Sequence, residues 1–194
     1  GVALGLKVGH SSRSLDAMVR QAQAAENVRT GQIVLWTDTF ASLERLLIGV
    51  GISALIGLVV GILSGGIPLL RAKLSPLITV TSLIPPMAIL PILFIAFGTG
   101  EAAKIALIVM GVTPFLIRDL QGHALRLPDE QLIKAQTLGA SSWQVLLRVL
   151  LPQLTPRLLN ATRLALGSAW LFLIAAEAIA AQEGLGYRIF LVRR

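Results

Sequence analysis

The chain alternates between long apolar runs and short polar segments, most of them basic. The first run extends from Leu46 to Leu70 without a charged residue, which at 1.5 Å per helical residue is long enough to cross a bilayer. Three further apolar segments follow at about residues 77–97, 102–117 and 164–181. The pattern predicts an all-α, polytopic membrane helical bundle, of which four spans are visible in this chain.

Small residues recur at every fourth position of the first span. They are Gly49, Ser53, Gly57, Gly61 and Gly65. In a helix this spacing places all five on one face, where the backbone of a second helix can approach closely. We expect the face to serve helix packing, and a direct role in transport is the alternative.

The second span, "LITVTSLIPPMAILPILFIAF", contains Pro85, Pro86 and Pro91. Proline removes a donor from the helical hydrogen-bond ladder, so these residues should bend or unwind the helix. In lipid, the freed carbonyl groups are tolerated only where protein or a water-filled cavity satisfies them. The span is therefore expected to face the bundle interior, either as a packing kink or as part of a translocation pathway.

Glu177 interrupts the last apolar segment. An ionisable side chain within a span is costly and is by default a functional candidate, so Glu177 is also a candidate for the translocation pathway. Two alternatives stay open for this residue. It can make a structural hydrogen bond to a neighbouring span, or it can lie near the membrane interface.

The polar segment between the third and fourth spans, residues 118–163, predicts a pair of short helices. Residues 129–138 form the first helix, which Gly139 can end in the left-handed conformation. Ser141 or Ser142 can cap the second helix, and Pro152 lies just beyond its expected end.

The second helix of this pair is amphipathic. Its apolar residues follow the i, i+3, i+4, i+7 pattern and are Trp143, Leu146, Leu147 and Leu150. Gln144 and Arg148 lie on the opposite side. A unit of this kind suits either of two functions, reading DNA with the second helix or docking against a cytoplasmic partner.

The DNA-binding alternative is the weaker of the two. Ala135, Gly139 and Val145 match the spacing of small, glycine and apolar residues in DNA-binding helix–turn–helix proteins. In that alignment, however, Lys134 and Arg148 occupy positions that must be buried and apolar, and the face toward the phosphates lacks a basic cluster. The segment is thus better interpreted as a docking unit that transmits motion to the spans.

Composition places the chain in the membrane class and argues against a metal or disulfide site. Of its 194 residues 55% are hydrophobic and 14% charged, which is more apolar than a soluble all-helical domain. It contains no cysteine, and its two histidines are isolated from other ligand-type residues. We expect neither a metal nor another cofactor.

The net charge of +7 orients the spans, because basic residues concentrate in cytoplasmic loops. Residues 71–73 and 118–163 are basic and are expected inside, whereas the turn at residues 98–101 has no Lys or Arg. Residues 1–42 then form an outer or interfacial segment with a short amphipathic helix at residues 11–30, followed by a transmembrane domain at residues 43–194. Three residues at the end of the chain would lie outside against this rule: Arg188, Arg193 and Arg194.

The run "IKAQTLGASSWQVLLRVLLP" resembles the cytoplasmic loop of ABC-importer permeases. That family's pattern is Glu-Ala-Ala, three residues, Gly, nine residues, an aliphatic residue, one residue, then Leu-Pro. All its spacings are met, with Ile133 and Lys134 in place of the Glu and the first Ala. The segments "SLIPPMAILPILFIAFGTGEAAKI" and "LALGSAWLFLIAAEAIAAQEGLGYRI" are similar to other parts of the same family, and the likeness covers about residues 36–194.

The resemblance implies a type I ABC importer permease fold in a bacterial inner membrane, in the branch that serves nitrate, sulfonates, taurine and bicarbonate. It implies a second permease copy, separate ATP-binding cassette subunits and a periplasmic solute-binding protein as partners. The loop at residues 133–152 would contact the ATPase through Ala135, Leu138, Gly139, Ala140, Ser141, Ser142, Trp143 and Pro152. Members usually have six spans, so the first and last are expected to be absent from this chain.

The resemblance also implies that the chain is not an enzyme, because ATP hydrolysis belongs to a partner subunit. The sequence supports this expectation, since the stretch "GTGEAAK" lacks the spacing of a phosphate-binding loop. A secondary transporter is the alternative, because such proteins also use proline-broken helices. That alternative predicts paired mid-membrane charges and internal repeats, and the sequence offers Glu177 and no clear repeat.

Overall fold

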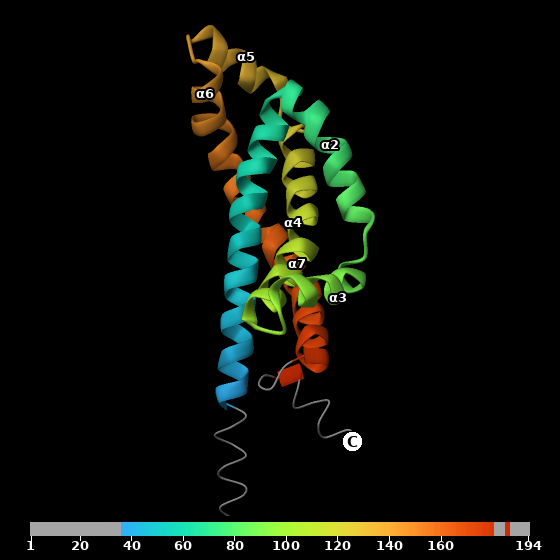
Figure 1. Cartoon of the computed structure of the whole chain (residues 1–194). Helices are drawn as coiled ribbons and strands as arrows, with labels where there is room; N and C mark the ends of the chain where they lie inside the picture. Colours follow the sequence, from blue (N-terminus) through green and yellow to red (C-terminus); the bar gives the residue numbers. More distant parts are fainter. Residues whose placement is uncertain (1–35, 181–184, 187–194) are drawn as a thin grey trace, which may run out of the picture. The chain divides into compact units, whose positions relative to one another are not determined.

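A computed structural model describes residues 36–180 and 185–186, and its regular structure there is entirely helical (Figure 1). A long helix, Trp36–Gly66, comes first. It is followed by α2 (Pro68–Leu83), α3 (Pro86–Phe97), α4 (Glu101–Ala124), α5 (Asp129–Thr137), α6 (Ser142–Val145), a π-helical turn η1 (Leu146–Leu150) and α7 (Leu151–Ala180). The amphipathic helix expected at residues 11–30 and the three C-terminal arginines lie outside the described residues.

The small residues of the long helix form its contact with α4. A Cβ atom built on Gly57 would lie 2.8 Å from the Cβ of Leu116, and one on Gly61 would lie 2.8 Å from the Cβ of Leu120. Gly49 and Gly65 stand in the same relation to α4, and Ser53 is fully buried. Each contact joins residues the same number of positions apart, so the two helices run parallel and in register.

A third helix completes the core. One buried cluster joins Leu46 and Val50 of the long helix to Ile108, Val112 and Leu116 of α4 and to a stripe on α7. The stripe repeats every fourth residue and consists of Ala161, Ala165, Ala169 and Leu173. Because alanine is small, α7 also approaches its neighbours closely. The predicted all-α membrane bundle is therefore confirmed.

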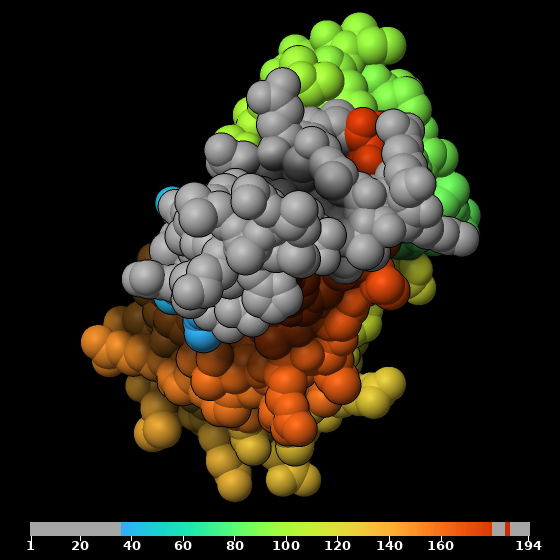
Figure 2. Space-filling model, turned by 90° about the horizontal axis from the view of Figure 1, so that it is seen from below, coloured from blue at the N-terminus to red at the C-terminus, as the bar shows by residue number. Residues whose placement is uncertain are grey.

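The proline-rich span is bent, as predicted for Pro85 and Pro86. Helices α2 and α3 meet at an angle of 94° at the break between Leu83 and Pro86. Pro85 is the N-cap of α3 and Pro86 its first residue, a position where the missing N–H costs nothing. Pro91 lies inside α3, which continues through it, so this proline does not unwind the helix. Figure 2 shows the green atoms of α2 and α3 gathered at one edge of the view, and orange atoms of the later helices at the opposite edge.

Several helix boundaries differ from the expected ones. The first span does not continue to Leu70, because the long helix ends at Gly66 and Pro68 starts α2. Helix α4 extends beyond residue 117 to Ala124, and α7 already begins at Leu151. The charged residues that suggested a long loop at 118–163 lie partly within these helices. Pro152 does not end the second loop helix, because it occupies the first turn of α7, where proline is tolerated.

Two of the described helices are long and apolar enough to cross a membrane, Trp36–Gly66 and Ser142–Ile179. The bent pair of α2 and α3 adds a third if it counts as one span. The expected span at residues 102–117 lies inside α4. That helix is not among the candidate spans of the described residues.

Candidate functional site

The turn between α5 and α6 has a fixed geometry. Gly139 adopts φ of 84°, a left-handed conformation that favours glycine. The N–H of Gly139 donates to the carbonyl of Gln136 at 2.9 Å, and the N–H of Ala140 donates to that of Ala135 at 3.0 Å. These two bonds form a Schellman motif, so the predicted glycine terminator of α5 is confirmed.

Ser141 starts the next helix. Its hydroxyl accepts from the N–H of Gln144, and the Gln144 side chain accepts from the N–H of Ser141, which makes a reciprocal capping box. The predicted serine cap is therefore confirmed at Ser141. The N–H groups of Gly139, Ala140 and Ser141 are all bonded to near neighbours in the chain, so local hydrogen bonds define the shape of the turn.

The buried face of the second loop helix differs from the predicted one. Leu146 and Leu150 are buried, but Trp143 and Leu147 are largely exposed, and Val145 is buried in their place. A π-helical turn begins at Leu146, and its wider winding changes where Leu147 and the residues after it point relative to a regular α-helix. Together with Ile62 and Leu120, the buried residues attach the loop to the bundle.

The outer surface of this turn is apolar and exposed. Leu138 is 87% exposed, and Ile133 and Trp143 are also exposed. Of the other residues predicted to couple to an ATPase, Ser141, Ser142 and Pro152 are exposed, whereas Ala135 and Ala140 pack partly against the buried cluster beneath. An exposed leucine on a rigid turn is suited to insert into a groove of a partner protein.

A buried charge cluster lies at the opposite end of α4 and α7. Glu177 is fully buried and accepts hydrogen bonds from Arg45 Nη1 at 2.7 Å, from the Ser42 hydroxyl at 2.8 Å and from the N–H of Gly186 at 3.0 Å. The N–H of Leu185 donates to the Ser42 oxygen at 3.1 Å. The carboxylate thus joins the long helix, α7 and residues 185–186.

Glu101 extends this cluster to the start of α4. Arg45 Nε donates to Glu101, and Lys104 Nζ donates to the same carboxylate at 2.9 Å. Burial alone would raise the pKa of Glu101, but the hydrogen bonds from Lys104 and Arg45 outweigh it and hold that pKa below its ordinary value. The geometry fits the structural hydrogen bond that the sequence left open as an alternative for Glu177.

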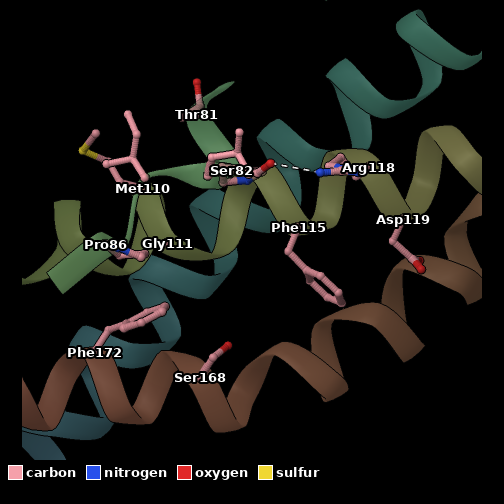
Figure 3. A pocket seen from close by; sticks show the side chains of 13 residues that line it. Thr81, Ser82, Pro86, Met110, Gly111, Phe115, Arg118, Asp119, Ser168 and Phe172 are labelled. Carbon is pink, nitrogen blue, oxygen red and sulfur yellow. Dashed lines mark hydrogen bonds between the residues drawn. The ribbon is translucent and has the colours of Figure 1, made fainter. Parts of the chain in front are cut away.

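A cavity of about 570 Å³ lies where α2 breaks, between α4 and α7 (Figure 3). Its polar lining includes Thr81, Ser82, Arg118, Asp119 and Ser168. Four residues were predicted to line a pathway. Pro86 is in the cavity lining, whereas Pro85, Pro91 and Glu177 are not in the lining formed by the described residues. The broken span therefore does border a solvent-sized space, but Glu177 belongs to a different part of the molecule.

The family model for "Binding-protein-dependent transport system inner membrane component" matches residues 27–194. The chain belongs to this family. Within the described residues, the family member has no group of three or more His, Cys, Asp or Glu residues placed to hold a metal ion.

Curated relatives of this family member carry transport names. The chain is 40% identical over 156 residues to the taurine transport system permease protein TauC of Escherichia coli, covering 80% of this chain and 56% of that protein. It is 36% identical to the bicarbonate transport system permease protein CmpB of Synechococcus elongatus, over 80% of this chain and 56% of that one. The chain thus spans little more than half the length of these relatives.

A solved structure shares the fold. Inward-facing conformations of the MetNI methionine ABC transporter superpose with a TM-score of 0.72 and 25% identity, covering 84% of this chain and 81% of that chain. The predicted type I importer permease-like fold is confirmed by this likeness. The family assignment predicted from the loop pattern is confirmed by the family match.

Sequence reasoning missed most of the buried charge cluster. Ser42, Arg45, Glu101 and Lys104 each lie near the end of an apolar run, where charged residues are commonly interfacial and unremarkable. It also missed Arg118 and Asp119 as cavity residues, because both were assigned to a loop. A usable signal existed for α7, whose alanines repeat every fourth residue and lead directly to Glu177.

Proposed function

We propose that this chain forms the core of the membrane-spanning permease subunit of an ATP-driven, binding-protein-dependent importer of a small solute. The observation that carries the proposal is the Gly139 turn. The turn presents Leu138 outward. The helices on either side of it, α5 and α6, pack against α4 and the start of α7 in the buried cluster that contains Leu120, Leu146 and Leu150. A push on the turn is therefore transmitted to both helices of the bundle core.

The proposed partners follow from this arrangement. An ATP-binding cassette subunit receives the exposed turn, a second permease copy completes the translocation pathway, and a periplasmic solute-binding protein delivers the solute. ATP hydrolysis is assigned to the ATPase subunit. The relatives named for taurine and bicarbonate support a small solute, and the family name supports a bacterial inner membrane location.

The proposed orientation places the Gly139 turn in the cytoplasm and the Glu177 cluster at the outer end of the bundle. The basic residues favour it, since α2 begins near α5 in Figure 1, the first turns of α2 contain Arg71 and Lys73, and α5 contains Lys134. Residues 1–42 then lie outside or at the outer interface. In this orientation the part of residues 118–163 outside α4 and α7 forms the coupling loop.

Affinity purification tests the function. The full-length protein, tagged and extracted in mild detergent from its own host, should bring down an ATP-binding cassette protein, and reconstituted complex should accumulate solute only with ATP and a binding protein. Uptake driven by an ion gradient without an ATPase would instead identify a secondary transporter. It would overturn the proposal.

A further inference from the structure

The cavity beside the α2 break has the size and mixed lining of a small-molecule site. Its volume of about 570 Å³ lies within the range of ligand pockets, roughly 300–1,000 Å³. Figure 3 shows Arg118 reaching toward Ser82 on one side, while Asp119 points toward α7. Met110, Phe115 and Phe172 form an apolar part of the lining.

The charges in the lining do not balance. Its two charged residues are Arg118 and Asp119. Both oxygens of Asp119 are engaged by Arg157, from Nε at 2.7 Å and from Nη2 at 2.5 Å. Arg118 makes no ion pair with any described residue, and its one hydrogen bond there is to the neutral hydroxyl of Ser82 at 3.0 Å. The cavity therefore carries one uncompensated positive charge.

The hydroxyl groups around Arg118 already donate hydrogen bonds within their own helices. Ser82 donates to the carbonyl of Thr79 at 2.8 Å, Thr81 to that of Leu77 at 2.8 Å, and Ser168 to that of Ala165 at 2.9 Å. The Ser82 oxygen is left as the acceptor that holds the guanidinium. Four of the five N–H groups of Arg118 have no acceptor among the described residues.

We propose that Arg118 binds the oxyanion group of the transported solute in this cavity, with the apolar wall of Met110 and Phe172 facing the rest of the solute. The inference rests on the proposed transport function. A guanidinium presents a planar set of donors that matches sulfonate, carboxylate or phosphate oxygens. The break in α2 positions Ser82 to hold the guanidinium toward the cavity.

Ligand-dependent thermal unfolding of the detergent-purified protein tests the site directly. The probes are methanesulfonate, the neutral methanesulfonamide of similar shape, and tetramethylammonium, all at constant ionic strength. Methanesulfonate should raise the Tm, and the other two should not. In Arg118→Gln the concentration giving half of the shift should rise about tenfold or more, and Arg118→Lys should recover part of the loss. Arg163→Gln removes an exposed arginine of α7 outside the cavity and should behave like the unmodified protein.

Three results would overturn the inference. One is an equal response of Arg118→Gln and the unmodified protein to methanesulfonate. Another is stabilisation by methanesulfonamide as large as by methanesulfonate. The third is an Arg118-dependent shift with added phosphatidylglycerol but not with methanesulfonate, which would assign the guanidinium to a lipid headgroup. Each leaves the transport function intact if the ATPase still co-purifies, whereas loss of the ATPase from the unmodified protein contradicts the function itself.

Discussion

Arg45 and Glu177 form a buried ion pair, with Arg45 Nη1 2.7 Å from Glu177 Oε1, and it joins the long helix to the last turns of α7. Glu177 is fully buried and the Arg45 side chain is 8% exposed. Removing one member of such a pair leaves a charge in a low-dielectric site with fewer hydrogen bonds. The pair is thus a constraint on how these two helices can separate.

Replacing Glu177 should destabilise the bundle. Glu177→Gln keeps the size of the side chain but removes the charge that faces Arg45, so we expect a loss of about 2–4 kcal/mol in the free energy of unfolding. Chemical unfolding in detergent measures this loss. The double variant Arg45→Gln, Glu177→Gln should lose less than the sum of the two single changes, because the two side chains contact each other directly and each single change already breaks their ion pair.

The half-exposed Glu101 is the matched control. Its side chain is 55% exposed, so Glu101→Gln should cost much less than Glu177→Gln. A pathway role for Glu177 makes a different prediction, namely a change in the relative uptake of two solutes without a loss of stability. That outcome would contradict the structural assignment.

Gly139→Asp should leave the protein folded in the membrane but abolish uptake and solute-stimulated ATPase activity. The left-handed turn disfavours a side chain by about 1 kcal/mol, and a carboxylate beside the exposed Leu138 would oppose docking. Gly100→Asp introduces the same group at the N-cap of α4, where aspartate is favourable, and should transport normally. Normal transport by the Gly139 variant would refute the docking role of the turn.

Glycines of the long helix should differ in their tolerance of alanine, depending on whether they face α4. Gly57→Ala would place a methyl group 2.8 Å from the Cβ of Leu116, so we expect a destabilisation of about 1–3 kcal/mol. Gly51 has nothing within 4 Å of the corresponding position, and Gly51→Ala should be neutral or stabilising by up to about 1 kcal/mol. Equal effects of the two changes on unfolding would show that the helices do not meet along this face.

Local features of the sequence predicted the structure well where short-range chemistry decides it. Gly139 and Ser141 determine a helix end and a helix start through bonds to near neighbours. The fourth-residue spacing identified the packing face of the long helix, but not α4 as its partner. Nothing in the sequence pairs Gly57 with Leu116, because that contact depends on how the whole bundle folds.

The errors have equally physical causes. Charged residues were treated as ends of spans, yet Asp119 and Arg157 neutralise each other between α4 and α7 and remain inside helices. The regular-helix pattern does not foresee the π-helical turn at Leu146–Leu150, and Leu147 within that turn is exposed. The cluster around Glu177 draws on residues far apart in the chain, and a sequence shows each of them only as an isolated polar group.

Changes to the ion pair between Asp119 and Arg157 should raise or lower the affinity of the oxyanion site, depending on which partner is removed. Asp119→Asn removes the negative charge next to Arg118 and leaves Arg157 without its ion pair, so the half-saturating concentration of methanesulfonate should fall several-fold, with little loss of stability. Arg157→Gln leaves the Asp119 carboxylate uncompensated beside Arg118 and should raise that concentration. Both shifts should shrink at high ionic strength, since the cavity is open to solvent. Changes of the same sign in the two variants would mean that stability, not charge, controls the response.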